Sequence, residues 1–250
     1  MKRLGITVCT RQRPKMLEQC IRSICADINA ALSDVVCFIV IVENDEFPRS
    51  KSIIDNVFHD HNKIEYHYEC EPSLGIPIAR NRAIGICLKN EADWLAFIDD
   101  DETLQCGWVD AMFQAATTLD ADALTGPVHS ILPSDPPVWW DPPSRDNRRH
   151  GELLVTAATN NTLIDCRWLA GDTELRFDEA LRFTGGSDTA FFYRLTDLGG
   201  RLKWVENAHV VETVPTARLI MRWQLNRKAR IAANNVRCLR ERKGRTAATL

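Results

Sequence analysis

Four acidic residues follow one another at the end of an apolar run. Asp99–Glu102 comes directly after Trp94–Ile98. Adjacent carboxylates repel one another unless a positive group lies between them. Their oxygens suit a hard divalent ion, Mg²⁺ or Mn²⁺, that carries the phosphates of a substrate. The alternative is a helix start, with Asp100 or Asp101 capping a helix that begins near Leu104. The cluster alone predicts either a metal–phosphate site or a helix cap.

Two other predicted strands also end in polar clusters. Leu4–Cys9 is followed by Thr10-Arg11-Gln12-Arg13-Pro14, and Val35–Val42 is followed by Glu43-Asn44-Asp45. If these strands are parallel, their carboxyl ends lie along one rim of a sheet, where open α/β sheets bind ligands. The sequence therefore predicts that three clusters meet in one site.

The elements that position these clusters alternate between strand and helix. Apolar residues at helical spacing and Pro14 at a first turn predict a helix to about Ala26. Such alternation is typical of βαβ units, so we predict an α/β fold with a Rossmann-like, mostly parallel central sheet flanked by helices. Further strands are predicted over 64–68, 123–128, 153–158, 162–164, 201–205 and 208–211, and further helices over 47–58, 74–88, 106–119, 189–198 and 217–242.

Composition limits the class of protein and its location. The chain has 250 residues, is 45% hydrophobic and 26% charged, and contains no apolar run long enough for a membrane span or a signal peptide. We therefore expect a cytoplasmic protein. Its charge is uneven, because residues 216–250 carry +9 while the rest carries −12. Such a basic segment suggests an anionic partner: a membrane surface, a lipid phosphate or nucleic acid.

Two later segments add candidates. Phe183-Thr184-Gly185-Gly186-Ser187-Asp188 is a predicted turn before a helix, and the proline-rich stretch 133–143 is a predicted loop that holds Trp139 and Trp140. Asp188 could act as a general base or cap the helix that follows. The two tryptophans could stack on a sugar, lie under the loop or dip into a membrane interface.

The order of these signals resembles glycosyltransferase family 2, the inverting family with the GT-A fold, over roughly residues 4–230. The likeness is to bacterial enzymes that build exopolysaccharide or lipopolysaccharide. The motifs that carry it are Cys9–Pro14, Val42–Asp45, Gly75–Asn81, Asp99–Asp101 and Gly185–Asp188. The resemblance implies a donor-binding half over 1–128, an acceptor-side and catalytic-base half over 129–215, and a basic C-terminal helix and tail over 216–250.

The resemblance also implies roles for individual residues. Asp99–Asp101 resembles the DxD motif of the family, which implies that Asp101 and Asp99 bind Mn²⁺ or Mg²⁺, with His209 as a late third ligand. Glu43 and Asn44 stand where the family usually has two Asp residues. Residues implied to bind the nucleotide sugar are Thr10, Arg11, Arg13, Glu43, Asn44, Asp45, Arg80, Asn81, Asp99 and Asp100.

The implied reaction is a single displacement. Asp188 would take the proton of an acceptor hydroxyl as it attacks the anomeric carbon of a nucleotide diphosphate sugar, expected to be a UDP-sugar. The acceptor would be a saccharide or a lipid-linked saccharide, contacted by Trp139, Trp140 and Asn161. The family commonly has Glu-Asp where this chain has Ser187-Asp188.

Other interpretations stay open at this point. A nucleotidyltransferase uses a similar sheet, although such enzymes usually have a glycine-rich loop after the first strand and none is present here. A non-catalytic nucleotide-sugar-binding protein is the other alternative. The acidic body argues against nucleic acid. The basic C-terminal helix allows peripheral attachment to the inner face of the cell membrane.

Overall fold

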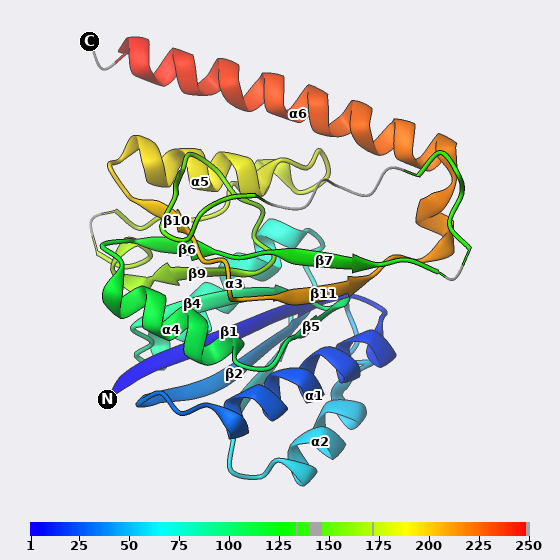
Figure 1. The fold of residues 1–250 in the computed structure, drawn as a ribbon, viewed down its shortest axis with the longest axis vertical. Helices are drawn as coiled ribbons and strands as arrows, with labels where there is room; N and C mark the ends of the chain where they lie inside the picture. The colour runs from blue at the N-terminus through cyan, green and yellow to red at the C-terminus, as the bar shows by residue number, and fades with distance from the viewer. Residues whose placement is uncertain (134, 141–146, 172, 249–250) are drawn as a thin grey trace.

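The fold is built on an eight-stranded sheet in the order β3-β2-β1-β4-β9-β6-β10-β8 (Figure 1). The structure is a computed structural model, and it describes residues 1–133, 135–140, 147–171 and 173–248. The strands of this sheet are β1 (Lys2–Thr10), β2 (Val35–Glu43), β3 (Glu65–Cys70), β4 (Trp94–Asp99), β6 (Ala123–Thr125), β8 (Leu153–Leu154), β9 (Thr162–Asp165) and β10 (Leu202–Trp204). A three-stranded sheet, β5 (Glu102–Leu104), β11 (Val210–Thr213) and β7 (Val128–Ile131), lies beside it.

The first four strands in the chain are parallel, as the sequence predicts. Thr10 of β1 lies opposite Glu43 of β2, and Cys9 lies opposite Asp99 of β4. This register places the three polar clusters on one rim, which confirms that part of the prediction. The sheet becomes mixed further along, because β9 runs antiparallel to both β4 and β6.

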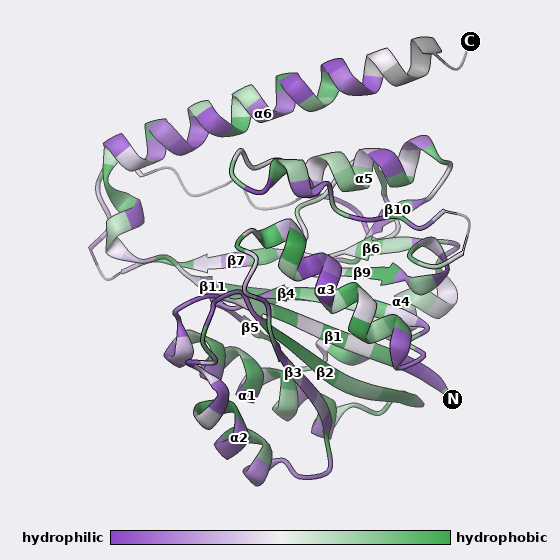
Figure 2. Cartoon of the chain, turned by 180° about the vertical axis from the view of Figure 1, so that it is seen from behind, coloured by the Kyte–Doolittle hydropathy of each residue, from purple (hydrophilic) through white to green (hydrophobic). Residues whose placement is uncertain are grey.

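Helices cover both faces of the large sheet. On one face lie α1 (Pro14–Ala30), α2 (Lys51–Asp60) and α4 (Trp108–Thr118), and on the other lie α3 (Ile76–Lys89) and α5 (Ser187–Asp197) (Figures 1 and 2). In α1 the apolar residues Leu17, Ile21 and Ile24 recur at helical spacing and are fully buried. Burial of each such side chain contributes about 1.5–3 kcal/mol, which fixes the helix against the sheet.

The last helix, α6 (Met221–Ala248), follows a short 3₁₀ helix, η3 (Thr216–Leu219), and runs alongside α5 (Figure 1). The side chains of Asn234 and Arg237 donate hydrogen bonds to the backbone oxygens of Thr184 and Gly185, just before α5. Along its length, α6 alternates between polar and apolar residues (Figure 2). Across the described residues, no helix has the length and apolar character needed to cross a membrane.

The structure differs from the predicted elements after the acidic cluster. Strand β5, which begins with the fourth acid Glu102, follows Asp101 in place of a helix near Leu104, so the helix-cap interpretation of Asp100 and Asp101 is wrong. Helix α4 begins only at Trp108, after Gly107 with φ 88°. The carboxylate of Asp27, from α1, accepts hydrogen bonds from the N–H groups of Gly107 and Val109 and so caps the start of this helix.

Two predicted strands are also shorter than expected. The strand predicted over 123–128 is two strands, β6 and β7, because Gly126-Pro127 interrupts it. A Cβ on Gly126 would lie 2.4 Å from the backbone oxygen of Ala208, so only glycine fits this approach. Of the strand predicted over 153–158, only Leu153–Leu154 pairs with a neighbour. In the proline-rich loop predicted over 133–143, residues 134 and 141–143 lie outside the described residues.

Candidate active site

Hydrogen bonds to Asp100 join the polar cluster after β1 directly to the acidic cluster after β4. The hydroxyl of Thr10 donates to Asp100 Oδ2 at 2.7 Å, and Arg13 Nη1 donates to Asp100 Oδ1 at 2.9 Å. Burial raises the pKa of the Asp100 carboxyl, while the bonds from Thr10 and Arg13 oppose that rise. Asp100 therefore joins the loop after β1 to the end of β4.

Asp99 and Asp101 lie on either side of this buried link. The side chain of Asp99 is 44% exposed and lies 3.5 Å from Arg80 Nη2. Partial burial and the neighbouring carboxylates of Asp188 and Asp101 raise the pKa of the Asp99 carboxyl to about 6, against the attraction of Arg80. Asp101 Oδ2 pairs with Arg218 Nη2 at 2.9 Å and with Arg13 Nη1 at 3.4 Å. Two guanidinium groups therefore compensate the charge of Asp101.

The carboxylates of Asp99 and Asp101 are hard oxygen donors of the kind that Mg²⁺ and Mn²⁺ bind. Within the described ranges, no group of three or more His, Cys, Asp or Glu residues could hold a metal ion. Mg²⁺ often binds to proteins through one or two carboxylates and takes its other ligands from water and substrate phosphates. The donor set fits an ion that arrives with a diphosphate, and it offers no complete cage of protein ligands.

Asp188 lies in the first turn of α5, whose N-cap is Gly186 with φ 84°. The N-cap interpretation of Asp188 is therefore wrong. Asp188 Oδ1 accepts hydrogen bonds from Arg80 Nη1 at 2.6 Å and from Ser187 Oγ at 3.0 Å. Its Oδ2 accepts from the hydroxyl of Thr159 at 2.9 Å and from its N–H at 3.3 Å. Although burial opposes it, the charge of Arg80 and these hydrogen bonds lower the pKa of Asp188.

The polar cluster after β2, Glu43-Asn44-Asp45, bonds to neighbouring loops and helix starts on the same rim. Glu43 is fully buried and accepts hydrogen bonds from the N–H and hydroxyl of Ser50 and from the hydroxyl of Tyr68. Asn44 donates to the backbone oxygens of Glu71 and Ser73.

The side-chain oxygen of Asn44, Oδ1, also accepts a hydrogen bond from the N–H of Gly75, directly before α3. Asn44 thereby fixes the entry of the helix that carries Arg80. Asp45 accepts from Gln12 and Arg49. The nucleotide contacts predicted for Glu43, Asn44 and Asp45 stay predictions.

Other predicted residues are distributed around the rim. Arg11 is exposed, and Asn81 bonds to both the N–H and the oxygen of the Phe177 backbone. Trp139 is 42% exposed and its ring centroid lies 6.5 Å from that of Trp140. His209 Nδ1 lies 2.8 Å from His129 Nε2, and burial lowers the pKa of His209. The metal contact of His209 and the acceptor contacts of the two tryptophans stay predictions.

The two neighbouring asparagines after Thr159 differ in their surroundings. The side chain of Asn161 is fully buried and bonds to Trp108 Nε1 and to the backbone oxygens of Pro127 and Ala208. Asn160 instead lines a cavity and donates a hydrogen bond to Glu102. The acceptor contact predicted for Asn161 stays untested, and Asn160 is the member of the pair with access to the cavity.

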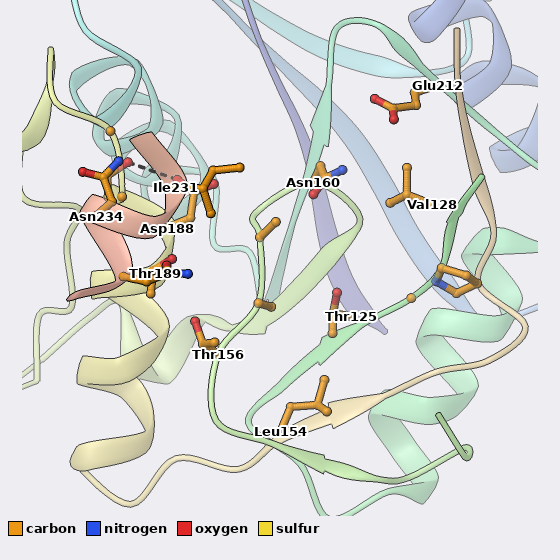
Figure 3. Close-up of a pocket in the computed structure, with 18 of the residues that line it drawn as sticks. Thr125, Val128, Leu154, Thr156, Asn160, Asp188, Thr189, Glu212, Ile231 and Asn234 are labelled. Carbon is orange, nitrogen blue, oxygen red and sulfur yellow. Dashed lines mark hydrogen bonds between the residues drawn. The ribbon is translucent and has the colours of Figure 1, made fainter. Parts of the chain in front are cut away.

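This cavity has a volume of about 1380 Å³ and lies between β6–β7, the start of α5 and the inner side of α6. Asp188 and Asn160 line it together with Glu212 and His209, and Ile231 and Asn234 of α6 close one side (Figure 3). A space of this size exceeds the few hundred Å³ of a small ligand site. Asp188 therefore lines a large cavity on one side, and on the other it is linked through Arg80 to the rim at β1 and β4.

Sequence reasoning missed several residues of this arrangement. Thr159 and Arg218 each bond to a carboxylate of the site from a distant segment. The buried position of Glu102 was also not predicted. No local pattern marks Thr159 or Arg218, whereas the unexplained fourth acid was a signal that Glu102 has a partner.

Comparisons with known proteins agree with the fold. A family model described as Glycosyl transferase family 2 matches residues 6–171. The chain is 31% identical over 249 residues to the succinoglycan biosynthesis protein ExoM of Rhizobium meliloti (strain 1021), covering 96% of this chain and 76% of that protein.

Among solved structures, S. aureus TarS 1–349 matches with a TM-score of 0.66 at 17% identity, over 85% of this chain and 60% of that one. The same fragment in complex with UDP-GlcNAc matches with a TM-score of 0.67 at 15% identity, over 86% of this chain and 59% of that one. This chain thus spans about three fifths of those TarS chains. The structural likeness confirms the α/β fold predicted from the sequence.

Proposed function

Because this chain belongs to glycosyltransferase family 2, we propose that it transfers a sugar from a UDP-sugar to a saccharide or lipid-linked saccharide acceptor in the synthesis of a bacterial surface polysaccharide. ExoM is a succinoglycan biosynthesis protein, which supports the polysaccharide class. The TarS complex with UDP-GlcNAc supports a UDP-linked donor.

One observation carries the proposal: Arg80 joins the two sides of the site. Its guanidinium lies 2.6 Å from Asp188 and 3.5 Å from Asp99, and its side chain is only 7% exposed. Asp99 ends a strand on the rim where open sheets bind nucleotides, and Asp188 lines the large cavity. A donor at the rim and an acceptor in the cavity would therefore meet at Arg80.

The proposed reaction is a single displacement with inversion. A hydroxyl of the acceptor attacks the anomeric carbon of the donor, and the bond from that carbon to the diphosphate oxygen breaks. Asp188 takes the proton of the hydroxyl as general base. Thr159 and Ser187 hold its carboxylate in place, and the lowered pKa keeps it ionised at neutral pH. The rim supplies Thr10, Arg13, Arg80 and Asp100 to bind and orient the donor.

Asp99 and Asp101 would hold the divalent ion, Mn²⁺ or Mg²⁺. When bound, the ion neutralises charge on the leaving diphosphate as a Lewis acid. For the diphosphate to reach Asp101, Arg218 must give up part of its contact with that carboxylate. The free guanidinium is then available to pair with phosphate oxygens.

The outer part of α6 supports a membrane-surface location at the inner face of the cell membrane. Met221, Leu225 and Val236 are each at least 49% exposed, and α6 carries many arginines and lysines. Basic amphipathic helices of this kind bind anionic lipid surfaces. The proposed division is a donor half over 1–128, an acceptor and base half over 129–215, and this basic segment over 216–250.

Calorimetric titration tests the proposal. Wild-type protein is expected to bind UDP in the presence of Mn²⁺, and Asp101→Ala is expected to abolish this binding. Asp188→Asn is expected to abolish transfer while donor affinity stays within about threefold, because the isosteric change removes only the base. A wild type that binds no nucleoside diphosphate would contradict the proposal. Donor binding without turnover would indicate a non-catalytic binding protein.

A further inference from the structure

Glu102 is the acid of the cluster that the proposed mechanism leaves without a role. It is only 1% exposed. Its Oε2 accepts a hydrogen bond from the N–H of Asp99 at 3.0 Å, and its Oε1 accepts from Asn160 Nδ2 at 2.7 Å. A buried carboxyl group of this kind is costly unless it is hydrogen-bonded. Its two described partners are a backbone amide and a side-chain amide.

These two contacts fix the orientation of the Asn160 amide. Asp99 offers only an N–H at this position, so Oε2 of Glu102 must accept there. Asn160 Nδ2 donates to Glu102 Oε1 at 2.7 Å, so the amide turns its NH₂ toward Glu102. The carbonyl oxygen of Asn160 is then directed away from Glu102. Glu102 thus determines which end of the amide can face another partner.

Asn160 lies where an acceptor would enter. It lines the cavity together with Asp188 (Figure 3), and its neighbour Thr159 holds Asp188 through two hydrogen bonds. Glu102 and Asn160 therefore form a link from Asp99 to the segment that carries the Asp188 contacts. Arg80 forms a second link, between the carboxylates of Asp99 and Asp188.

We propose that Glu102 is a positioning residue that orients the amide of Asn160, so that its carbonyl oxygen accepts a hydrogen bond from a hydroxyl of the acceptor sugar beside Asp188. This inference rests on the proposed function and adds a specificity contact to it. A site that bonds to a hydroxyl discriminates strongly, because an unmatched polar group there is left without a partner.

An exchange of carboxylate and amide between the two positions tests the proposal. In Glu102→Gln the new side chain must keep its oxygen toward the N–H of Asp99, so its NH₂ faces Asn160. The Asn160 amide then flips and turns its NH₂ into the cavity. In Glu102→Gln combined with Asn160→Asp, the new NH₂ donates to the new carboxylate, whose other oxygen again accepts in the cavity. Shape and net charge are the same in wild type and double variant.

The assay uses a panel of UDP-sugars as donors with Mn²⁺ and a panel of p-nitrophenyl hexosides as acceptors. For the hexoside that wild type uses best, Glu102→Gln is expected to raise the acceptor KM about 10- to 100-fold, as for a lost and reversed hydrogen bond. The Kd for UDP with Mn²⁺ is expected to change less than about threefold, because the bond to Asp99 is kept. The double variant is expected to recover the acceptor KM to within about threefold of wild type. Asn160→Ala, which leaves the bond between Glu102 and Asp99 in place, is expected to raise the acceptor KM alone.

The outcomes separate this inference from the proposed function. If wild type transfers sugar but Glu102→Gln leaves the acceptor KM unchanged, only the role of Glu102 is wrong. If the acceptor KM rises in Glu102→Gln and stays equally high in the double variant, the orientation argument is likewise refuted. If Glu102→Gln fails to fold, an unchanged acceptor KM in the double variant supports the inference and a raised one overturns it. A wild type that neither binds UDP nor transfers sugar refutes the proposed function itself.

Discussion

Replacement of Arg80 by glutamine is expected to shift the pH dependence of the reaction. Arg80 Nη1 lies 2.6 Å from Asp188 Oδ1, and the exposed fractions of the two side chains are 7% and 29%. A hydrogen bond to a charged group contributes about 1.5–3 kcal/mol. Since about 1.4 kcal/mol corresponds to a tenfold change, loss of this contact should raise the proton affinity of Asp188 about 10- to 100-fold.

The direction of the shift follows from the charges. Arg80 lowers the pKa of Asp188 and also opposes the raised pKa of Asp99. Both carboxylates act in their ionised forms. Without Arg80 their pKa values rise, so on acidification they become protonated, and the enzyme loses activity, at a higher pH than in wild type. The acidic limb of kcat/KM for the donor, which reports the free enzyme, is expected to move up by about one to two pH units in Arg80→Gln.

The assay measures transfer from the UDP-sugar that wild type uses best, between pH 4 and 8, for three variants, at a temperature at which circular dichroism shows each to be folded. Arg80→Lys keeps the charge, so its acidic limb of kcat/KM should lie close to that of wild type. Arg82→Gln removes an arginine from the same helix, but this side chain is 54% exposed and pairs with Glu69, so the limb should not move. An unshifted limb in Arg80→Gln, or an equal shift in Arg82→Gln, would refute the assignment of Arg80 to the charge balance of Asp188.

Three further predictions address the ion site, the fold and the basic helix. Arg218→Ala removes a cation 2.9 Å from Asp101, so Mn²⁺ without nucleotide should bind about 3- to 10-fold tighter by water proton relaxation; equal or weaker binding would contradict competition at that carboxylate. Asp27→Ala leaves two N–H groups at the start of α4 without their acceptor, and urea unfolding should show a loss of about 2–3 kcal/mol, whereas a loss below about 0.5 kcal/mol would argue against this cap. Leu225→Glu with Val236→Glu should reduce sedimentation with phosphatidylglycerol vesicles at least about fivefold; undiminished sedimentation would exclude this face of α6 from lipid binding.

The sequence determined the order of strands and helices and the rim on which the chemistry gathers. Hydrophobic periodicity is a local property, so Leu17, Ile21 and Ile24 predict a helix wherever it packs. Parallel pairing then follows from strand–helix alternation, and it brings Thr10 beside Glu43 and Cys9 beside Asp99. The resemblance of Asp99–Asp101 to the DxD motif of glycosyltransferase family 2 is likewise a property of the sequence, and the metal role that it implies stays a proposal.

Only the tertiary structure decided how each charge is compensated. Arg80 and Asp188 are 108 residues apart, Asp101 and Arg218 are 117 apart, and Glu102 and Asn160 are 58 apart. Short-range patterns predict which residues share a helix face or strand end, but not which side chain from a distant loop fills a given hydrogen-bond position. The four consecutive acids illustrate this difference. In sequence they are one cluster, whereas in the fold Asp99, Asp100, Asp101 and Glu102 have different partners. The chain turns after Asp99, the last residue of β4, and Glu102 already begins β5, so each side chain meets another part of the chain.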